Sequence, residues 1–170
     1  MMKTEINVRR LELREPFGIS RGTSVEKFNT FVEIDAGVGE AAPSNFYGES
    51  PETVQTVIPL LLKVIEEDPF AIEASYRAMK IRFRGNAAAK AAIDMALYDR
   101  MGKELGQPLY KIWGLDPSRT TLTSYTIGIS DTEDMLRKVR AAKDYPVLKI
   151  KMGHAGDLEQ LQAIRAITDQ

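Results

Sequence analysis

The chain has 170 residues, 44% of them hydrophobic, so it is long enough for one ordinary domain and part of a second. Its 23 basic and 24 acidic residues leave a net charge of −1, which argues against a dedicated binder of nucleic acid or anionic membranes. The absence of cysteine excludes disulfides, thiolate metal sites and a cysteine nucleophile. No apolar run is long enough to span a bilayer, and we expect a cytoplasmic protein.

The first predicted element is a three-stranded antiparallel meander. Apolar residues recur at nearly alternate positions over residues 3–14, with room for a bulge, and again over residues 27–35. Ala36-Gly37 supplies a turn into the third strand. Pro16-Phe17-Gly18 predicts a loop that continues to Thr23 and separates the first two strands.

Three helices are expected next. Ser50-Pro51-Glu52 is typical of a helix start, because serine caps, proline suits the first turn, and an acid lies beside the positive end of the dipole. Asp68-Pro69 repeats this signal, and Asn86 is expected to cap a third helix over residues 87–102. Small and apolar residues give that third helix a face suited to close packing: Ala88, Ala91, Ala92, Met95 and Leu97. These elements predict an α+β domain extending to about residue 115.

Strands and helices alternate after residue 115. A strand is expected over residues 121–129 and a second over residues 146–152. Ser130 and Glu133 predict a capping box for the intervening helix, and a last helix is expected over residues 157–168. This order is typical of right-handed parallel βαβ units.

Two βα units cannot form a finished parallel sheet, because parallel strands are normally buried on both faces. We therefore infer that the chain is part of a longer protein. The alternative is a complete protein that closes its sheet edge by self-association. We expect a homo-oligomer.

Lys149-Ile150-Lys151 is the most informative short pattern. Side chains alternate across a strand, so the two lysines share one face, with Cα atoms about 6.6 Å apart. Leu148 and Ile150 hold the other face. A face of paired lysines is suited to a base tuned by its neighbour's like charge. The alternative is an edge strand whose lysines point into water and discourage aggregation.

The order of elements, with Lys-x-Lys on the second strand of the βα series, resembles the enolase superfamily. The similarity is greatest to its muconate-lactonizing subgroup and, within that, to the dipeptide epimerases of the L-Ala-D/L-Glu type. It extends over nearly the whole chain and is carried by these segments: Gly39-Glu40-Ala41-Ala42-Pro43, Asn86 to Asp99, Gly106-Gln107-Pro108-Leu109-Tyr110, Ser124-Tyr125-Thr126-Ile127 and Leu148 to Gly153.

The resemblance implies a fold and a reaction. Residues 1–115 would be an α+β N-terminal capping domain, and residues 116–170 the first two βα units of a (β/α)7β TIM-like barrel. The implied reaction is Mg²⁺-assisted 1,1-proton transfer, an epimerisation at the α-carbon of a dipeptide. By this resemblance Lys151 is the acid/base catalyst, and Lys149 is the neighbour that contacts the substrate carboxylate.

The family's three Mg²⁺-binding carboxylates and its opposing lysine belong to later barrel strands. No Asp or Glu of residues 1–170 matches those positions, so no metal ligand is assigned in this chain. We expect residues 1–170 to be inactive alone.

Three further residues are expected to bind substrate. Arg21, in the loop over residues 17–24, suits a fork onto a carboxylate; the alternative is a surface arginine. Tyr47, in the loop over residues 44–49, lines the pocket or packs on the capping domain. Thr126 points toward the ligand or toward a helix. His154, the only histidine, follows the lysine strand and is either functional or simply solvated.

Three classes of function remain open at this stage. The first is a dipeptide epimerase. The second is another subgroup enzyme: a cycloisomerase, an o-succinylbenzoate synthase or an N-acylamino acid racemase. The third is a non-catalytic fragment. The sequence indicates a small-molecule carboxylate partner, and neither nucleic acid nor a membrane, but it does not identify the dipeptide.

Overall fold

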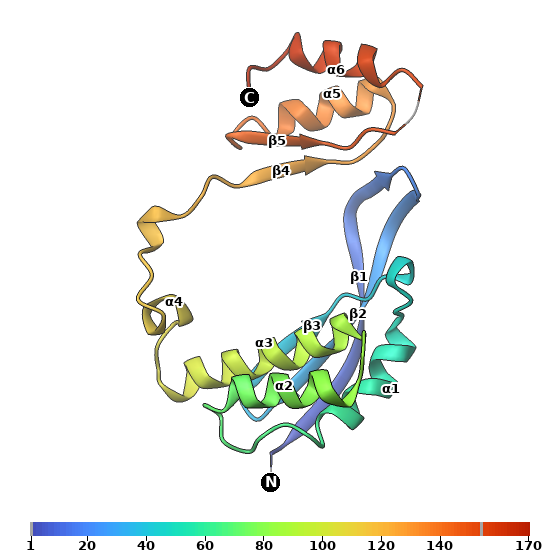
Figure 1. Cartoon of the computed structure of the whole chain (residues 1–170). Helices are drawn as coiled ribbons and strands as arrows, with labels where there is room; N and C mark the ends of the chain where they lie inside the picture. The colour runs from blue at the N-terminus through green and yellow to red at the C-terminus, as the bar shows by residue number, and fades with distance from the viewer. Residues whose placement is uncertain (1, 154) are drawn as a thin grey trace. The chain divides into compact units, whose positions relative to one another are not determined.

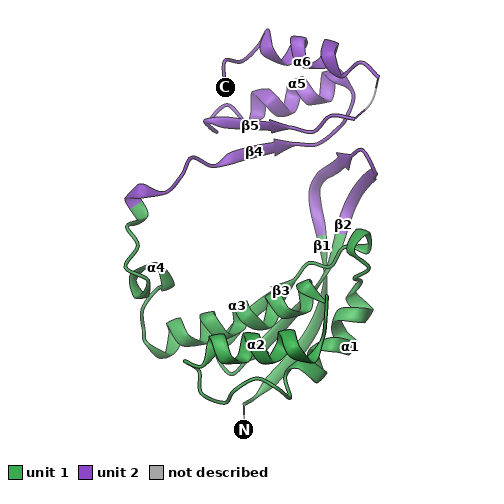
Figure 2. Cartoon of the chain, viewed as in Figure 1, with its two compact units in different colours: residues 1–11, 27–117 green, residues 12–26, 118–170 purple. Residues whose placement is uncertain are grey.

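The computed structural model describes residues 2–153 and 155–170, and it divides the chain into two compact units (Figure 1, Figure 2). The first unit comprises residues 1–11 and 27–117, and the second comprises residues 12–26 and 118–170. The tip of the N-terminal hairpin therefore belongs to the same compact unit as the two βα units. The expected domain boundary at residues 115–116 stays a prediction. His154 lies outside the described residues.

The predicted antiparallel meander is confirmed. It consists of β1 (Thr4–Ile19), β2 (Gly22–Ile34) and β3 (Gly37–Ala41), in the spatial order β1-β2-β3. Ile34 pairs with Gly37, so the turn is Asp35-Ala36, one residue earlier than expected.

The loop predicted over residues 16–23 is wrong. β1 runs through Pro16 to Ile19, and only Ser20 and Arg21 separate it from β2. β1 has only one neighbour, β2, in this sheet, and proline is tolerated on an edge strand because one row of N–H groups has no partner there.

The first unit contains the helices α1 (Pro51–Leu61), α2 (Ile72–Arg82), α3 (Ala87–Glu104) and α4 (Leu109–Ile112) and the 3-10 turn η1 (Asn45–Tyr47). A second 3-10 turn, η2 (Pro117–Arg119), spans the boundary between the two units in the sequence. The predicted cap at Ser50 is confirmed: its side chain accepts a hydrogen bond from the Thr53 backbone N–H in a reciprocal capping box.

The other two predicted helix starts are corrected. Asp68 accepts a hydrogen bond from the Phe70 backbone N–H at 2.9 Å, which closes a turn, and α2 begins only at Ile72. Asn86 precedes α3 in a left-handed conformation, and its amide donates to the Arg84 carbonyl instead of capping the helix.

Helix α3 lies directly on β3. A Cβ added to Gly39 would stand 1.8 Å from the Ala92 carbonyl oxygen, and one added to Gly37 would stand 2.0 Å from that of Ala96. Only glycine permits so close an approach of strand and helix. The buried side of α3 includes Ala89, Ala92, Ile93, Ala96 and Leu97, whereas Ala91 and Met95 of the predicted face are exposed.

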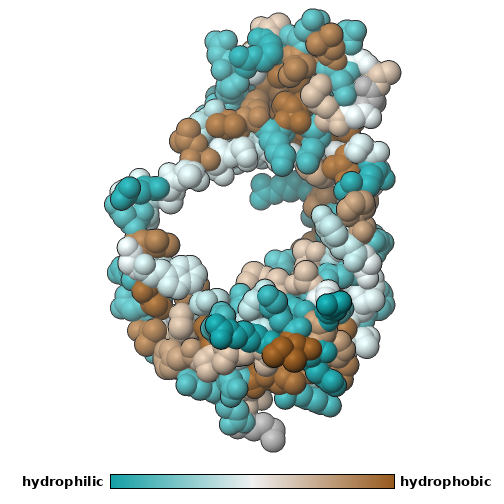
Figure 3. All heavy atoms as spheres, viewed as in Figure 1, coloured by the Kyte–Doolittle hydropathy of each residue, from teal (hydrophilic) through white to brown (hydrophobic). Residues whose placement is uncertain are grey.

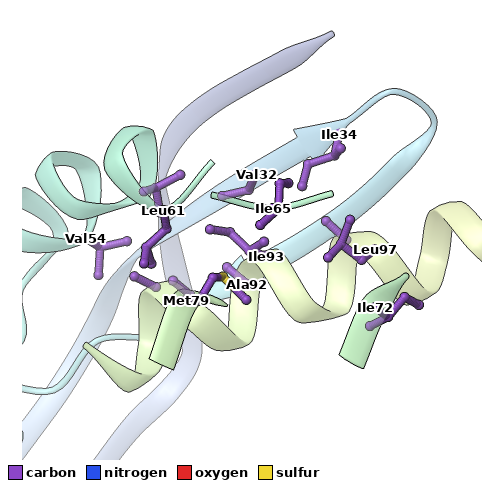
Figure 4. Close-up of a cluster of buried hydrophobic side chains, with 14 of the residues drawn as sticks. Val32, Ile34, Val54, Leu61, Ile65, Ile72, Met79, Ala92, Ile93 and Leu97 are labelled. Carbon is purple, nitrogen blue, oxygen red and sulfur yellow. The ribbon is translucent and has the colours of Figure 1, made fainter. Parts of the chain in front are cut away.

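The core of the first unit lies between the sheet and its helices (Figure 4). Val32 and Ile34 of β2 meet Leu61 of α1 and Ile93 of α3, all fully buried. Burial of such side chains is worth about 1.5–3 kcal/mol each, which makes this core the main source of the unit's stability.

The second unit contains β4 (Ser124–Ile127), α5 (Thr132–Ala141), β5 (Val147–Ile150) and α6 (Asp157–Arg165). The strands pair in parallel as predicted, but both are shorter than expected. Helix α5 is capped by Asp131, whose side chain accepts from the Asp134 backbone N–H, so the predicted Ser130–Glu133 box is wrong. Figure 1 shows both helices on the same face of the two strands.

Exposed apolar residues are scattered. The visible face of each unit mixes hydrophilic and hydrophobic residues (Figure 3). Among the residues that the structure describes, no helix combines the length and apolarity needed to cross a membrane.

Candidate functional site

The two faces of β5 differ sharply in character. Leu148 and Ile150 pack against the buried cluster formed by Ile127, Met135, Val139 and Ile164. Alternation along the strand therefore directs Lys149, which is exposed, to the face opposite the helices. The structure agrees with the predicted division of the strand into an apolar and a lysine face.

Lys151 follows the last residue of β5 and is held in line with the strand. Its backbone N–H donates a hydrogen bond of 2.9 Å to the Ile127 carbonyl of β4. The residue is partly buried, whereas Lys149 is exposed. This bond extends the parallel pairing to the C-terminal ends of the strands, which is where barrel enzymes gather their catalytic residues.

Thr126 shares the lysine face. It is the register partner of Lys149 in the parallel pair, and its neighbour Ile127 is buried among the helices. Thr126 itself is only partly buried. The structure thus brings Thr126, Lys149 and Lys151 to one face at one end of the sheet, while their roles stay predictions.

Arg21 lies in the two-residue turn at the tip of the β1–β2 hairpin and is exposed. This tip contacts the residues that follow β4 and β5. The Ile129 backbone N–H donates to the Gly18 carbonyl at 2.9 Å, and a Cβ added to Gly153 would stand 2.9 Å from the Cβ of Ser20. The turn that carries Arg21 therefore lies near the same ends of β4 and β5 as Lys151.

Tyr47 belongs to the first unit. It lies in η1, its side chain is 79% exposed, and its ring meets that of Phe46 edge-on at a centroid distance of 5.0 Å. Its predicted role in lining the pocket stays a prediction.

Sequence reasoning missed a charged cluster where the hairpin tip meets α5. Arg137 forms an ion pair with Glu15 at 2.9 Å and another with Asp134 at 2.7 Å, and Lys138 pairs with Asp134 at 2.6 Å. The hydrogen bond from Arg137 lowers the pKa of Glu15 below its usual range. Hydrogen bonds from Lys138, Arg137 and Ser130 likewise lower the pKa of Asp134. Nothing in the sequence signals a pair of residues 122 positions apart.

The sequence assigned no metal ligand in this chain. Within residues 2–153 and 155–170, no three acidic or histidine side chains gather closely enough to hold a metal ion. These described residues therefore do not fit a Mg²⁺ site, which requires several oxygen ligands.

Comparison with known proteins shows the family of this chain. The model of the mandelate racemase / muconate lactonizing enzyme N-terminal domain matches residues 1–114. The L-Ala-D/L-Glu epimerase of Bacteroides thetaiotaomicron is 39% identical over 168 residues, which are 94% of this chain and 43% of that protein.

Solved structures agree with this relationship. The dipeptide epimerase of Enterococcus faecalis V583, complexed with Mg and the dipeptide L-Leu-L-Tyr, aligns with a TM-score of 0.89 at 33% identity, covering 99% of this chain and 51% of that one. The N-succinyl Arg/Lys racemase of Bacillus cereus aligns with a TM-score of 0.88 at 28% identity, covering 99% and 49%. The chain thus spans about half the length of these relatives.

Proposed function

Because the chain belongs to the mandelate racemase / muconate lactonizing enzyme family of the enolase superfamily, we propose that it forms part of a dipeptide epimerase in which Lys151 moves the α-proton. The similar epimerases of Bacteroides thetaiotaomicron and Enterococcus faecalis support the substrate class. Lys149, Thr126, Arg21 and Tyr47 are proposed to bind the substrate.

The observation that carries the proposal is the fixed position of Lys151. Its backbone hydrogen bond to Ile127 keeps the residue in register after β5, on the face that the helices leave uncovered. Thr126 and Lys149 stand on the same face. A partly buried lysine at the C-terminal ends of parallel strands, with a second lysine two positions before it, is suited to acid/base work on a bound carboxylate.

The chemical step is a proton transfer that changes no oxidation state. The neutral amine of Lys151 takes the proton as the C–H bond breaks, and the electron pair moves into the neighbouring carbonyl to form an enediolate. Return of a proton to the opposite face of the α-carbon inverts the centre. One lysine cannot serve both faces of a planar intermediate, so the proposal requires a second acid on the opposite face.

Mg²⁺ accompanies a dipeptide in the Enterococcus faecalis structure. A bound divalent cation would supply positive charge to an enediolate. Among the described residues of this chain, no cluster of side chains fits such an ion.

The test uses the protein encoded by the complete gene, incubated with a panel of L,L-dipeptides in deuterated buffer. Loss of the α-proton signal in the NMR spectrum measures exchange directly. We expect exchange with at least one dipeptide, and we expect Lys151→Ala to lower its rate by roughly 10²–10⁴-fold, the usual contribution of a general acid/base. Residues 1–170 alone should show no exchange.

A matched control is Lys143→Ala, which removes an exposed lysine just after α5 and should leave the rate unchanged. Near-normal exchange by Lys151→Ala would remove that residue from its role. Failure of every dipeptide would overturn the proposed substrate class.

The second candidate is an N-acylamino acid racemase. It is favoured by the similarity to the N-succinyl Arg/Lys racemase of Bacillus cereus. Both reactions need the same lysine, so Lys151→Ala does not separate them. If N-succinyl amino acids exchange their α-proton and no dipeptide does, the racemase is selected. If neither substrate class exchanges, a non-catalytic protein, a cycloisomerase or a synthase is favoured.

A further inference from the structure

The hairpin tip, residues 12–26, belongs to the second unit (Figure 2), where it contacts the segment after β4 and helix α5. Gly18 is buried, and a Cβ added to it would stand 2.2 Å from the Ile129 carbonyl oxygen. A Cβ added to Gly128 would in turn stand 2.9 Å from the Gly18 backbone nitrogen. Two glycines thus allow the backbones of the tip and of the segment after β4 to meet directly.

A bidentate ion pair forms a second point of attachment. Arg137 on α5 donates from Nη1 to Glu15 Oε1 at 2.9 Å and from Nη2 to Glu15 Oε2 at 3.0 Å. Two parallel hydrogen bonds fix direction as well as distance, which a single charge contact does not. Glu15 precedes the Ser20–Arg21 turn by only five residues, so its position constrains that turn.

The guanidinium of Arg137 is also held by residues of its own helix, α5. Arg137 Nε and Nη2 both donate to Asp134 Oδ1, at 3.0 and 2.7 Å, and Asp134 also accepts a contact from Lys138. Contacts within α5 therefore orient the Arg137 guanidinium toward Glu15 on the hairpin. Pre-orientation reduces the side-chain entropy that usually makes an exposed ion pair weak.

The ion pair borders an open space. A cavity of about 390 Å³ lies between the hairpin and the start of α5, and Glu15 and Arg137 are among the residues that line it. The ion pair therefore connects the hairpin to α5 at the edge of a gap between them.

We propose that Glu15 and Arg137 are positioning residues, whose ion pair holds the hairpin tip on the ends of β4 and β5 and so sets where Arg21 meets the substrate. This inference rests on the proposed function, because the contact between Arg21 and the substrate is part of that proposal. Neither Glu15 nor Arg137 touches the reacting atoms. Their effect passes through the backbone of residues 15–21.

The experiment compares Glu15→Gln, Arg137→Gln, the double variant and Arg137→Lys in the protein encoded by the complete gene. Arg140→Gln is the matched control, because Arg140 is an exposed arginine one turn along α5. Glu15 and Arg137 are themselves about half exposed, with side-chain exposures of 46% and 53%, so their variants should fold.

The first readout is amide hydrogen exchange of residues 17–24, which needs no enzymatic activity. We expect each single Gln variant to speed exchange there by about three- to tenfold, and the double variant to exceed neither single variant, as coupled residues do. The exchange rate of Arg137→Lys should lie between those of the parent and the Gln variants, because lysine keeps the positive charge but cannot form the bidentate hydrogen bonds. Unchanged exchange, or additive effects, would overturn the proposal.

The second readout is steady-state epimerisation of a dipeptide that ends in glutamate and of one that ends in alanine. We expect KM for the acidic dipeptide to rise about three- to tenfold in the Gln variants, with kcat changed much less. KM for the apolar dipeptide should stay within twofold of the parent. Equal changes for both substrates would show that the pair does not act through a contact between Arg21 and the acidic side chain of the substrate.

The two hypotheses fail separately. A parent protein without epimerase activity, but with faster exchange in both Gln variants, would refute the proposed function and the link to the substrate while keeping the attachment of the tip. An active parent whose variants exchange like Arg140→Gln would refute the positioning role and leave the proposed function intact.

Discussion

The two units differ in how large a core covers the face of each sheet. In the first unit, fifteen described hydrophobic residues are buried in one cluster between the sheet and its helices, and α3 approaches β3 so closely that only glycine fits at Gly39. In the second unit, the corresponding cluster has four such residues. Its two strands are covered by α5 and α6 on one face only (Figure 1), and the other face carries Thr126 and Lys149.

This difference separates stability from the proposed chemistry. A unit with a large continuous core gains most of the free energy of folding from burial. A sheet face that carries hydroxyl and ammonium groups gains little, but it offers groups that a ligand can use. The first unit is therefore expected to be the stable part of the chain, and the second the more easily opened part.

The largest expected effect comes from Gly39→Val in the first unit. The added Cβ would need the space 1.8 Å from the Ala92 carbonyl oxygen, and backbone cannot move aside as a flexible side chain can. We expect a loss of at least about 3 kcal/mol in the free energy of unfolding, from overpacking at a helix–sheet contact. Chemical denaturation followed by circular dichroism measures it.

Val38→Ala is the control, because Val38 is the adjacent strand residue and its side chain is 42% exposed. It should cost well under 1 kcal/mol. A stable Gly39→Val protein would mean that α3 and β3 can separate without harm, and the contrast between the two units would lose its main support.

Cavity formation gives the next largest effects, and it compares the two cores directly. Ile93→Ala removes a fully buried side chain from the larger core and should cost about 3–5 kcal/mol. Ile127→Ala in the smaller core should cost about 2–3 kcal/mol, because few buried neighbours surround the void and they can collapse into it.

Hydrogen exchange resolves the two cavity variants by unit, since one melting curve need not describe both. Ile127→Ala should speed exchange in α5 and α6 and leave α3 protected. Global loss of protection in that variant would show that the units unfold together and would contradict the proposed difference in stability.

Local sequence signals predicted the elements well where a single residue decides the conformation. Ser50 begins α1 because a hydroxyl at that position satisfies the Thr53 N–H, and this chemistry is visible in sequence. Lys149 and Lys151 could be assigned to one face because strand alternation is strict. The family resemblance supplied the reaction class on top of these local arguments.

Predictions failed where distant contacts decide. Pro16 and Gly18 suggested a loop, yet Gly18 is glycine because β1 meets Ile129 there, more than a hundred positions later in the chain. The Glu15–Arg137 pair was missed for the same reason. The buried face of α3 was rotated from the predicted one, since the glycines of β3, and not the helix's own pattern, determine which alanines face the sheet.

A smaller effect is expected from Asp134→Asn in the second unit. Hydrogen bonds from Lys138, Arg137 and Ser130 lower the pKa of Asp134 below the usual value of 3.8, so the ionised form stabilises the fold. That contribution is complete above pH 3.8 and is lost as the pH falls through the lower folded value. At pH 7 the variant should lose about 1 kcal/mol, seen as faster exchange in α5.

Glu133→Gln is the control for that substitution, since Glu133 is the exposed neighbour of Asp134. The difference between Asp134→Asn and the parent should shrink in strongly acidic buffer, where the parent carboxylate is also protonated. A difference that is independent of pH would mean that the ionised form of Asp134 is not what stabilises the start of α5.

The smallest effect, with the opposite sign, is expected from Asp94→Asn in the first unit. Asp94 lines a cavity of about 520 Å³ between α2 and α3, where burial, and secondarily the charge of Glu73, raises its pKa above the usual value of 3.8. A raised pKa means that the ionised form opposes folding above the folded value, and that this cost disappears as the pH falls to 3.8 and below. Because the side chain is only partly buried, Asp94→Asn should raise the free energy of unfolding at pH 7 by a few tenths of a kcal/mol.

Asp99→Asn on the same helix is the matched control for Asp94→Asn. Asp99 accepts hydrogen bonds from the Val38 backbone N–H at 2.8 Å and from Lys103 at 2.6 Å, so loss of these bonds should destabilise the first unit. Two aspartates five positions apart on α3 are thus expected to respond in opposite directions, one relieved by neutralisation and the other weakened by it. Urea denaturation of both variants at pH 7 and pH 4 measures the pair. If both substitutions destabilise the protein equally at pH 7, burial of Asp94 has no cost, and the cavity beside it is better hydrated than its lining residues imply.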